Sequence, residues 1–254
     1  MIPPQITIGP IVIHLYGVII ALAIYLGYLL AKKRASLFQI PKSLFDEPIL
    51  IIPLVFGIIG ARLYHVIDFW SFYKTDLQSI LFVWNGGLGI LGGLAGVFIG
   101  FLFISKVRKI NFFSLLDLAS PSVLLGQAIG RFGNFFNQEA FGSPTNLPWG
   151  IYIDPQSRPS DYQSFSRFHP TFFYEAALDF IFFIVLLRFS QKSNVKGQTF
   201  ALYLILYSIG RFVVEFWRID TARIGDIKIA HILTALIFLL GIYLFLRKKK
   251  KSTP

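Results

Sequence analysis

Long apolar runs alternate with short polar connections along most of this chain. Seven runs of 17 to 21 residues carry few charges, and each can cross about 30 Å of hydrocarbon as a helix. The predicted spans are 11–31, 49–67, 86–104, 112–130, 171–187, 199–216 and 229–246. The pattern predicts an all-α polytopic membrane protein with about seven transmembrane helices, in which residues 1–254 form a single integral-membrane domain.

The fourth run, 112–130, is the weakest of the seven, because Asp117, Pro121 and Gln127 interrupt it. A proline inside a helix removes a backbone donor and disturbs the preceding turn. We therefore expect this segment to be broken or only partly inserted.

Lys and Arg gather in alternate connections between the runs. They are dense after the first, third and fifth runs and in the tail 247–254, and sparser elsewhere. Because cytoplasmic connections carry the excess of positive charge, we expect the N-terminus outside and a basic cytoplasmic tail at 247–254. The same bias places an arm or lid at about 141–170 outside. Residues 74–84 are a candidate second arm in the membrane interface.

Composition agrees with a membrane protein, since 55% of the residues are hydrophobic and 15% are charged. The net charge of +11 comes from the clusters between the runs, so we predict no nucleic-acid partner. The chain has no cysteine, which excludes a disulfide framework, an all-cysteine metal site and a cysteine nucleophile within the chain. We predict no metal and no cofactor. The N-terminus lacks a basic n-region, so we expect the first run to be its own insertion signal.

The densest polar stretch is 126–142, directly after an apolar run. It contains Arg131, Asn134, Asn137 and Glu139 together with four glycines. A charge at the bilayer centre costs roughly 2.5–3.5 kcal/mol, so such a group is a functional candidate by default. A helix end with satisfied backbone groups is the alternative. It does not explain all four polar residues together, and we favour a functional site.

A second cluster lies in the sixth run. The spacing of Tyr207, Arg211, Glu215 and Arg218 places all four on one helical face. The Arg211–Glu215 pair is either a structural link between helices or a device that orients Arg211 toward a ligand phosphate. Two arginine sites facing one interior indicate a buried place for an anion, such as a lipid phosphate.

Several single residues need a partner or a role. Tyr16 suits an interfacial aromatic belt, whereas the role of nearby His14 stays open between an interface residue and a proton acceptor. For His169 we favour a structural cap over catalysis. Glu175 and Asp179 lie four residues apart in an apolar run and need partners, for which the buried arginines are candidates.

Residues 86–100 contain seven glycines within one predicted span. We favour small-residue helix packing over a bare backbone that lines a lipid cavity.

Together these motifs resemble the prolipoprotein diacylglyceryl transferase family over nearly the whole chain. The resemblance is carried by IHLYG at 13–17, GARLYHV at 60–66, WNGGLGILGGLAG at 84–96, GRFGNFFNQEAFG at 130–142, HPTFFYEA at 169–176 and GRFVVEFWR at 210–218.

The resemblance implies transfer of the diacylglyceryl group of phosphatidylglycerol to the lipobox cysteine of a prolipoprotein signal peptide. A thioether forms and glycerol 1-phosphate leaves. It also implies the bacterial plasma (inner) membrane, with the site toward the periplasmic side, and we expect a monomer. We assign catalysis to Arg131, Arg211, Glu139, Tyr16 and His14. We assign binding of phosphatidylglycerol to Arg131, Asn134, Asn137, Gly142, Tyr207 and Glu215.

One position departs from the family pattern. Many members have a histidine before the second glycine pair of the glycine-rich span, where this chain has Leu91. Either the base is elsewhere, with His14 or Tyr16 as candidates, or the field of Arg131 and Arg211 ionises the substrate thiol.

Two other classes of function compete with this interpretation. An anion or lipid transporter would use the same buried arginines, but it is expected to have pseudo-symmetric halves, which are not evident. An intramembrane protease needs a serine in a suitable setting or two paired aspartates. Asp117 and Asp179 meet that requirement only nominally.

Overall fold

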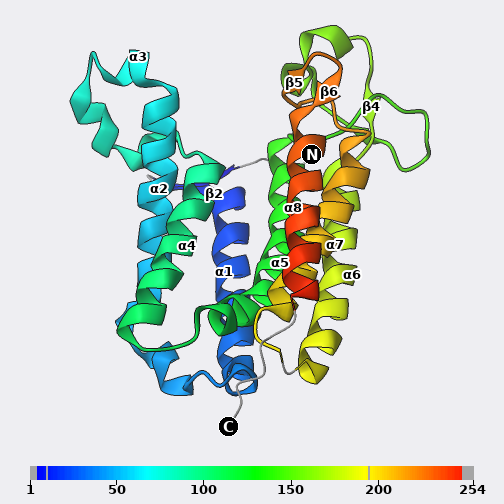
Figure 1. The fold of residues 1–254 in the computed structure, drawn as a ribbon. Coiled ribbons are helices and arrows are strands. Elements are labelled where there is room, and N and C mark those ends of the chain that lie inside the picture. Colours follow the sequence, from blue (N-terminus) through cyan, green and yellow to red (C-terminus); the bar gives the residue numbers. More distant parts are fainter. Residues whose placement is uncertain (1–4, 10, 194, 248–254) are drawn as a thin grey trace. The chain divides into compact units, whose positions relative to one another are not determined.

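The computed structural model describes residues 5–9, 11–193 and 195–247. The chain divides into two compact units, one formed by Lys32–Leu116 and the other by Met1–Ala31 together with Asp117–Pro254. Within the described residues, each of the seven predicted runs coincides with a helix of 17 or more residues (Figure 1). The mostly helical fold is thereby confirmed. Lys248–Lys251 of the predicted basic tail lie outside the described residues.

The larger unit contains most of the long helices. They are α1 (Leu15–Arg34), α5 (Phe112–Asn137), α6 (Thr171–Lys192), α7 (Gln198–Glu215) and α8 (Ile229–Leu246). Helix α7 packs against both α6 and α8, and the three helices run side by side in Figure 1.

Helix α1 packs against α5 in the antiparallel sense. Gly27 lies against Ser122, Ile20 lies against Gly130, and the Tyr16 ring lies against Gly133. The residue numbers rise along α1 as they fall along α5, which fixes the direction. This packing places Tyr16 beside the segment that carries Arg131.

The smaller unit is built on α2 (Ile52–Asp68), α3 (Trp70–Tyr73) and α4 (Ile90–Val107). Helices α2 and α4 approach closely through small residues. A Cβ atom at Gly92 would come within 2.1 Å of the Gly60 carbonyl oxygen, and one at Gly96 within 2.0 Å of the Phe56 oxygen. Small-residue packing is therefore the role of this part of the glycine-rich run.

A buried arginine organises the segment between α2 and α4. Arg62 donates to the carbonyl oxygens of Ser79, Ile80, Phe82, Gly86 and Gly87 at 2.5–3.4 Å. A guanidinium has five N–H groups, and these five carbonyls match that number. Arg62 on α2 therefore holds the segment 79–87 through the backbone carbonyls of that segment.

Three two-stranded antiparallel sheets add to the helices. The pairs are β1 (Gln5–Ile8) with β2 (Ile11–His14), β3 (Ile151–Tyr152) with β4 (Arg167–Phe168), and β5 (Arg223–Ile224) with β6 (Ile227–Lys228). Short 3-10 turns occur at Ala35–Phe38, Lys42–Asp46, Pro48–Ile51, Leu77–Leu81, Val83–Asn85, Pro155–Ser157 and Ser160–Tyr162. Phe141, Ile153, Phe168 and Phe172 form a buried cluster that gives the 141–170 segment its own small core.

Three details of the predicted runs are wrong. The first helix begins at Leu15 because Ile11–His14 pairs with Gln5–Ile8, so His14 ends a strand and does not lie on the span. The third helix begins at Ile90, because Gly86 and Gly87 have positive φ and turn their carbonyls toward Arg62. The fourth helix is not broken, since α5 continues through Pro121.

Membrane spans can be recognised by length and composition alone. Among the described residues, five helical segments meet these criteria: Leu15–Phe38, Pro48–Asp68, Ile90–Val107, Phe112–Asn137 and Ile229–Leu246. Helices α6 and α7 fall outside this set and carry ionisable residues, among them Glu175, Asp179, Arg211 and Glu215. The apolar helices are those of a multi-pass membrane protein.

Candidate functional site

Glu175, in the second turn of α6, is the centre of the most concentrated charge cluster. Its Oε2 pairs with Nη2 of Arg131, and its Oε1 lies 3.1 Å from Nη1 of Arg211 and 3.1 Å from Nη1 of Arg218. Three guanidinium groups from α5, α7 and the turn after α7 thus share one buried carboxylate. The expectation that Glu175 is paired with buried arginines is confirmed.

The expected link between Arg211 and Glu215 is also present. Glu215 Oε2 lies 2.7 Å from Arg211 Nη2, as an ion pair without hydrogen-bond alignment, and the Glu215 side chain is fully buried. Arg211 is therefore held between Glu175 on α6 and Glu215 on its own helix. Two carboxylates fix the plane of this guanidinium.

Arg218 reaches the cluster from a turn, because α7 ends at Glu215. Its Nε and Nη2 donate to the two carboxylate oxygens of Asp220 at 3.1 and 2.8 Å. Burial acts to lower the pKa of Arg218, but the carboxylates of Asp220 and Glu175 outweigh it and raise that pKa. Arg218 therefore stays charged.

Arg131 and Arg211 keep hydrogen-bonding capacity for a ligand. Among the described residues, Arg131 directs one N–H group at Glu175 and another at Asn134 Oδ1, 3.4 Å away. Arg211 donates one N–H to Glu175 and forms an ion pair with Glu215. Since each guanidinium has five N–H groups, both arginines retain donors suited to the oxygens of a phosphate.

The polar residues after Arg131 form a small network at the end of α5. Glu139 Oε1 accepts hydrogen bonds from Asn134 Nδ2 at 2.9 Å and from Asn137 Nδ2 at 3.3 Å. Gln138 and Ala140 have positive φ values of 51° and 56°, which turn the chain sharply out of the helix. Such backbone conformations are uncommon outside glycine and are enriched at functional sites.

Tyr16 and Tyr207 lie next to this cluster. The Tyr16 ring packs on Gly133, between Arg131 and Asn134 in the sequence. Tyr207 lies one helical turn before Arg211. His14 is exposed at the end of β2, opposite Gln5 in the hairpin.

Gly142 lies where three segments meet. Its N–H donates to the His169 carbonyl at 2.8 Å, and the residue forms a bridge with Arg218. A Cβ atom here would come within 2.9 Å of Thr171, Trp217 and His169. A glycine is therefore needed to bring Arg218 close to α6.

His169 precedes α6 and contacts other aromatic residues. Its Nδ1 lies 3.1 Å from the Tyr174 hydroxyl, which also accepts a hydrogen bond from Trp149 Nε1 at 2.9 Å. Burial lowers the pKa of His169, which favours the neutral ring. These contacts agree with a structural role before α6.

Asp117, which interrupts the fourth run, caps a helix. Its carboxylate accepts hydrogen bonds from the N–H groups of Gly197 and Phe200, at 2.5 and 2.8 Å, at the start of α7. A carboxylate is favourable at a helix N-terminus. This contact gives the buried aspartate a structural role.

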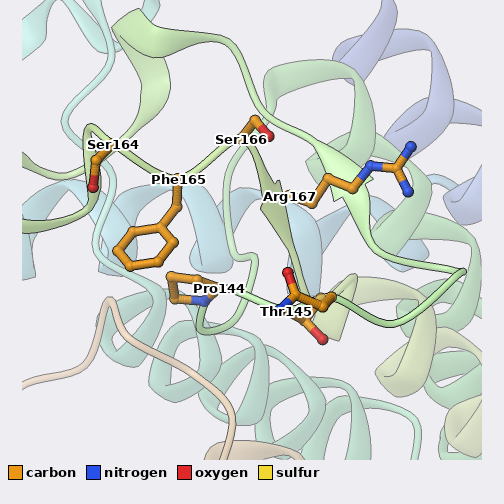
Figure 2. Close-up of a pocket in the computed structure, with 7 residues that line it drawn as sticks. Pro144, Thr145, Ser164, Phe165, Ser166 and Arg167 are labelled. Carbon is orange, nitrogen blue, oxygen red and sulfur yellow. The ribbon is translucent and has the colours of Figure 1, made fainter.

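A separate polar pocket of about 450 Å³ opens within the 141–170 segment. In Figure 2, the Phe165 ring lies next to Pro144, while the Arg167 guanidinium points away from both. The other lining residues are Thr145, Asn146, Ser164 and Ser166. The predicted site residues are not among those that line it.

Comparison with known proteins agrees with these features. The family model of prolipoprotein diacylglyceryl transferase matches residues 3–247. Relatives named phosphatidylglycerol–prolipoprotein diacylglyceryl transferase occur in Trichormus variabilis, Acaryochloris marina and Thermotoga maritima. Each is 40% identical over 97% of this chain, and the matches cover 91%, 92% and 85% of the relatives.

The fold is that of a multi-pass membrane protein with a buried cluster of arginines and carboxylates. The chain belongs to the prolipoprotein diacylglyceryl transferase family.

The site assigned from the sequence omits two residues of the cluster. For Glu175 the sequence predicts only that it has a partner, and it places Arg218 on a polar helical face without a role in the site. The signal for both was available, since each is a charged residue in or next to an apolar run. The convergence of Arg131, Arg211 and Arg218 on the Glu175 carboxylate depends on helix packing. It cannot be predicted from residue spacing within one run.

Proposed function

We propose that this chain transfers the diacylglyceryl group of phosphatidylglycerol to the lipobox cysteine of prolipoproteins. Family membership supports the reaction, because the curated relatives carry that enzyme name. The observation that carries the proposal is the pairing of Arg131 and Arg211 through Glu175, with N–H donors remaining on both arginines.

The reaction requires stabilisation of a leaving phosphate. The cysteine sulfur forms a bond to a glycerol carbon as the bond from that carbon to the phosphate oxygen breaks. The electron pair leaves with glycerol 1-phosphate, and the thiol proton passes to a base. Arg131 and Arg211 bind the phosphate oxygens and stabilise the charge that develops there.

Glu175 and Glu215 hold the arginines in place for this task. Without them, flexible arginine side chains would have to be ordered during the reaction, which raises the barrier. Asn134, Asn137 and Glu139 form the adjacent polar wall, and Tyr16 and Tyr207 flank it. Gly142 lets Arg218 approach α6. These assignments deepen the sequence prediction by adding Glu175 and Arg218 as positioning residues.

We further propose that the cluster faces the outer side of the bacterial plasma membrane. Within the larger unit, Arg131 lies near the C-terminal end of α5, Glu175 near the N-terminal end of α6, and Glu215 at the C-terminal end of α7. Because α6 runs antiparallel to the other two helices, all three residues lie on the same side of the unit. The basic residues Arg188 and Lys192 lie at the opposite end of α6, and Lys196 follows it. Because basic connections stay in the cytoplasm, this arrangement supports an external site, seven spans and an external N-terminus.

The proposed base is His14, with the field of Arg131 and Arg211 as the alternative. Neither requires a histidine at position 91, where Leu91 is an exposed apolar side chain in the first turn of α4. The arginine field alone favours the thiolate, since nearby positive charge lowers the pKa of a thiol.

The test is thioether formation by the purified protein on a lipobox peptide with phosphatidylglycerol. We expect release of glycerol 1-phosphate, and a loss of about 10²–10³-fold in turnover for Arg211→Lys, since Lys lacks the planar fork. Arg108→Lys is the matched control, because Arg108 forms a partly exposed pair with Glu47 in the other unit. Near-normal turnover of Arg211→Lys would contradict the proposed role, and absence of thioether with the unmodified protein would reject the reaction.

A further inference from the structure

Lys228 is a buried lysine that has backbone carbonyls as its hydrogen-bond partners. Its Nζ donates to the carbonyl oxygens of Glu215 at 2.5 Å, Arg218 at 2.6 Å and Phe216 at 3.5 Å. The residue is 8% exposed. An ammonium has three N–H donors, so these three carbonyls account for all of them.

These carbonyls belong to the end of α7 and the turn that follows it. The last carbonyls of a helix lack partners within the helix, and a cation is favourable there because of the helix dipole. The β5–β6 hairpin returns the chain to this point, with Lys228 paired opposite Arg223. Lys228 therefore caps the C-terminal end of α7, although it lies ten residues after Arg218 in the sequence.

The backbone that Lys228 holds carries two members of the charge cluster. Glu215 is the carboxylate partner of Arg211, and Arg218 shares Glu175 Oε1 with Arg211. A shift of this turn would move both side chains together. The distances at Glu175 thus depend on the position of the turn.

We propose that Lys228 is a positioning residue for the transfer reaction: it fixes the turn at Glu215–Arg218 so that Arg211 and Arg218 both reach Glu175. This inference rests on the proposed function, and it assigns Lys228 no contact with the substrate.

The charge environment of Lys228 adds a pH signature. Burial lowers the pKa of Lys228; Glu215 acts to raise it, and Arg223, Arg211 and Arg218 lower it further. These groups come from α7, the turn after it and β5, the elements that surround the ammonium. Lys228 therefore loses its proton, and one of its three donors, at a lower pH than an ordinary lysine. An arginine at this position would stay charged.

The kinetic experiment compares Lys228→Met and Lys228→Arg with Arg223→Met, which removes a positive charge from the same hairpin on an exposed side chain. We expect Lys228→Met to lower kcat by about 10–100-fold with little change in KM, because it displaces arginines without removing a ligand. Lys228→Arg should restore most of kcat, and its activity relative to the unmodified protein should rise as the pH is raised toward the ordinary lysine value of 10.5. A kcat for Lys228→Met within twofold of that for Arg223→Met would overturn the proposal, and so would identical pH profiles for Lys228→Arg and the unmodified protein.

A second readout does not use activity. If Lys228 positions Arg218 toward Glu175, the effects of Lys228→Met and Glu175→Gln on the unfolding midpoint should be coupled, whereas Arg223→Met and Glu175→Gln should add. Strict additivity of Lys228→Met with Glu175→Gln would count against the positioning role even if the protein proved inactive toward lipobox peptides. Failure of the proposed function is seen in the unmodified protein, and failure of the Lys228 inference is seen in the variants.

Discussion

Replacement of Glu175 by glutamine tests the centre of the charge cluster. The substitution keeps the size of the side chain and removes its charge. Arg218 retains Asp220 and Arg211 retains Glu215, but Arg131 is left with Asn134 as its remaining polar contact in the described structure. Loss of pairing at Arg131 should therefore dominate the effect.

The magnitude follows from burial. Removal of one partner of a buried ion pair costs about 3–5 kcal/mol. The Glu175 side chain is 5% exposed and that of Arg131 is 25% exposed, so we expect the lower end, about 3 kcal/mol. At about 2–4 °C per kcal/mol for a chain of this length, Tm should fall by roughly 6–12 °C. Turnover should fall as well, because Arg131 and Arg211 lose their common anchor.

The assay is thermal unfolding of the purified protein in detergent, combined with thioether formation. Glu47→Gln is the matched control: it removes a carboxylate from the more exposed pair with Arg108, where the loss should be about 0.2–1 kcal/mol. If Glu175→Gln lowered Tm no more than Glu47→Gln does and kept normal turnover, Glu175 would not hold the arginines in the way described.

Three further predictions concern topology, pH and the base. A reporter fused near Ser157 should read external and one after Lys196 cytoplasmic; the reverse reading at Ser157 would place the site on the wrong side for an exported substrate. Because burial lowers the pKa of His169 in the folded protein, the unfolded chain is protonated at His169 at a higher pH than the folded protein is. Stability should fall as pH drops below the ordinary value of 6.5, and His169→Asn should flatten that part of the unfolding curve; an unchanged curve would exclude His169 as the source. If His14 is the base, His14→Gln should lose turnover at about pH 7 and partly recover at about pH 9, whereas full activity at neutral pH would favour the arginine field.

The positions of the long helices could be predicted from apolar run length, but their ends could not. Residues 11–14 are as apolar as the helix that follows, and their strand depends on pairing with Gln5–Ile8. Pro121 indicated a broken helix, yet α5 is continuous. Helices that lie in membranes tolerate proline where neighbouring groups satisfy the backbone.

The members of the site could be predicted better than its geometry. Arg131 and Arg211 stand out because charge is rare in apolar runs. The three-fold sharing of Glu175 could not be predicted, since Arg211 and Arg218 lie 36 and 43 residues away in sequence and reach it only through packing of α6 and α7. The capping of α7 by Asp117, 80 residues before Gly197, has the same origin.

The shared carboxylate also constrains how the protein is assembled during synthesis. In the proposed seven-span topology, Arg131 enters the membrane on α5 well before Glu175 on α6, and Glu175 precedes Arg211 on α7. Each unpaired charge in lipid costs roughly 2.5–3.5 kcal/mol, so each of these helices is less stable there alone than when its charges are paired. We therefore expect the insertion machinery to retain α5 until α6 and α7 have been made, and to release the three helices to the bilayer as a group.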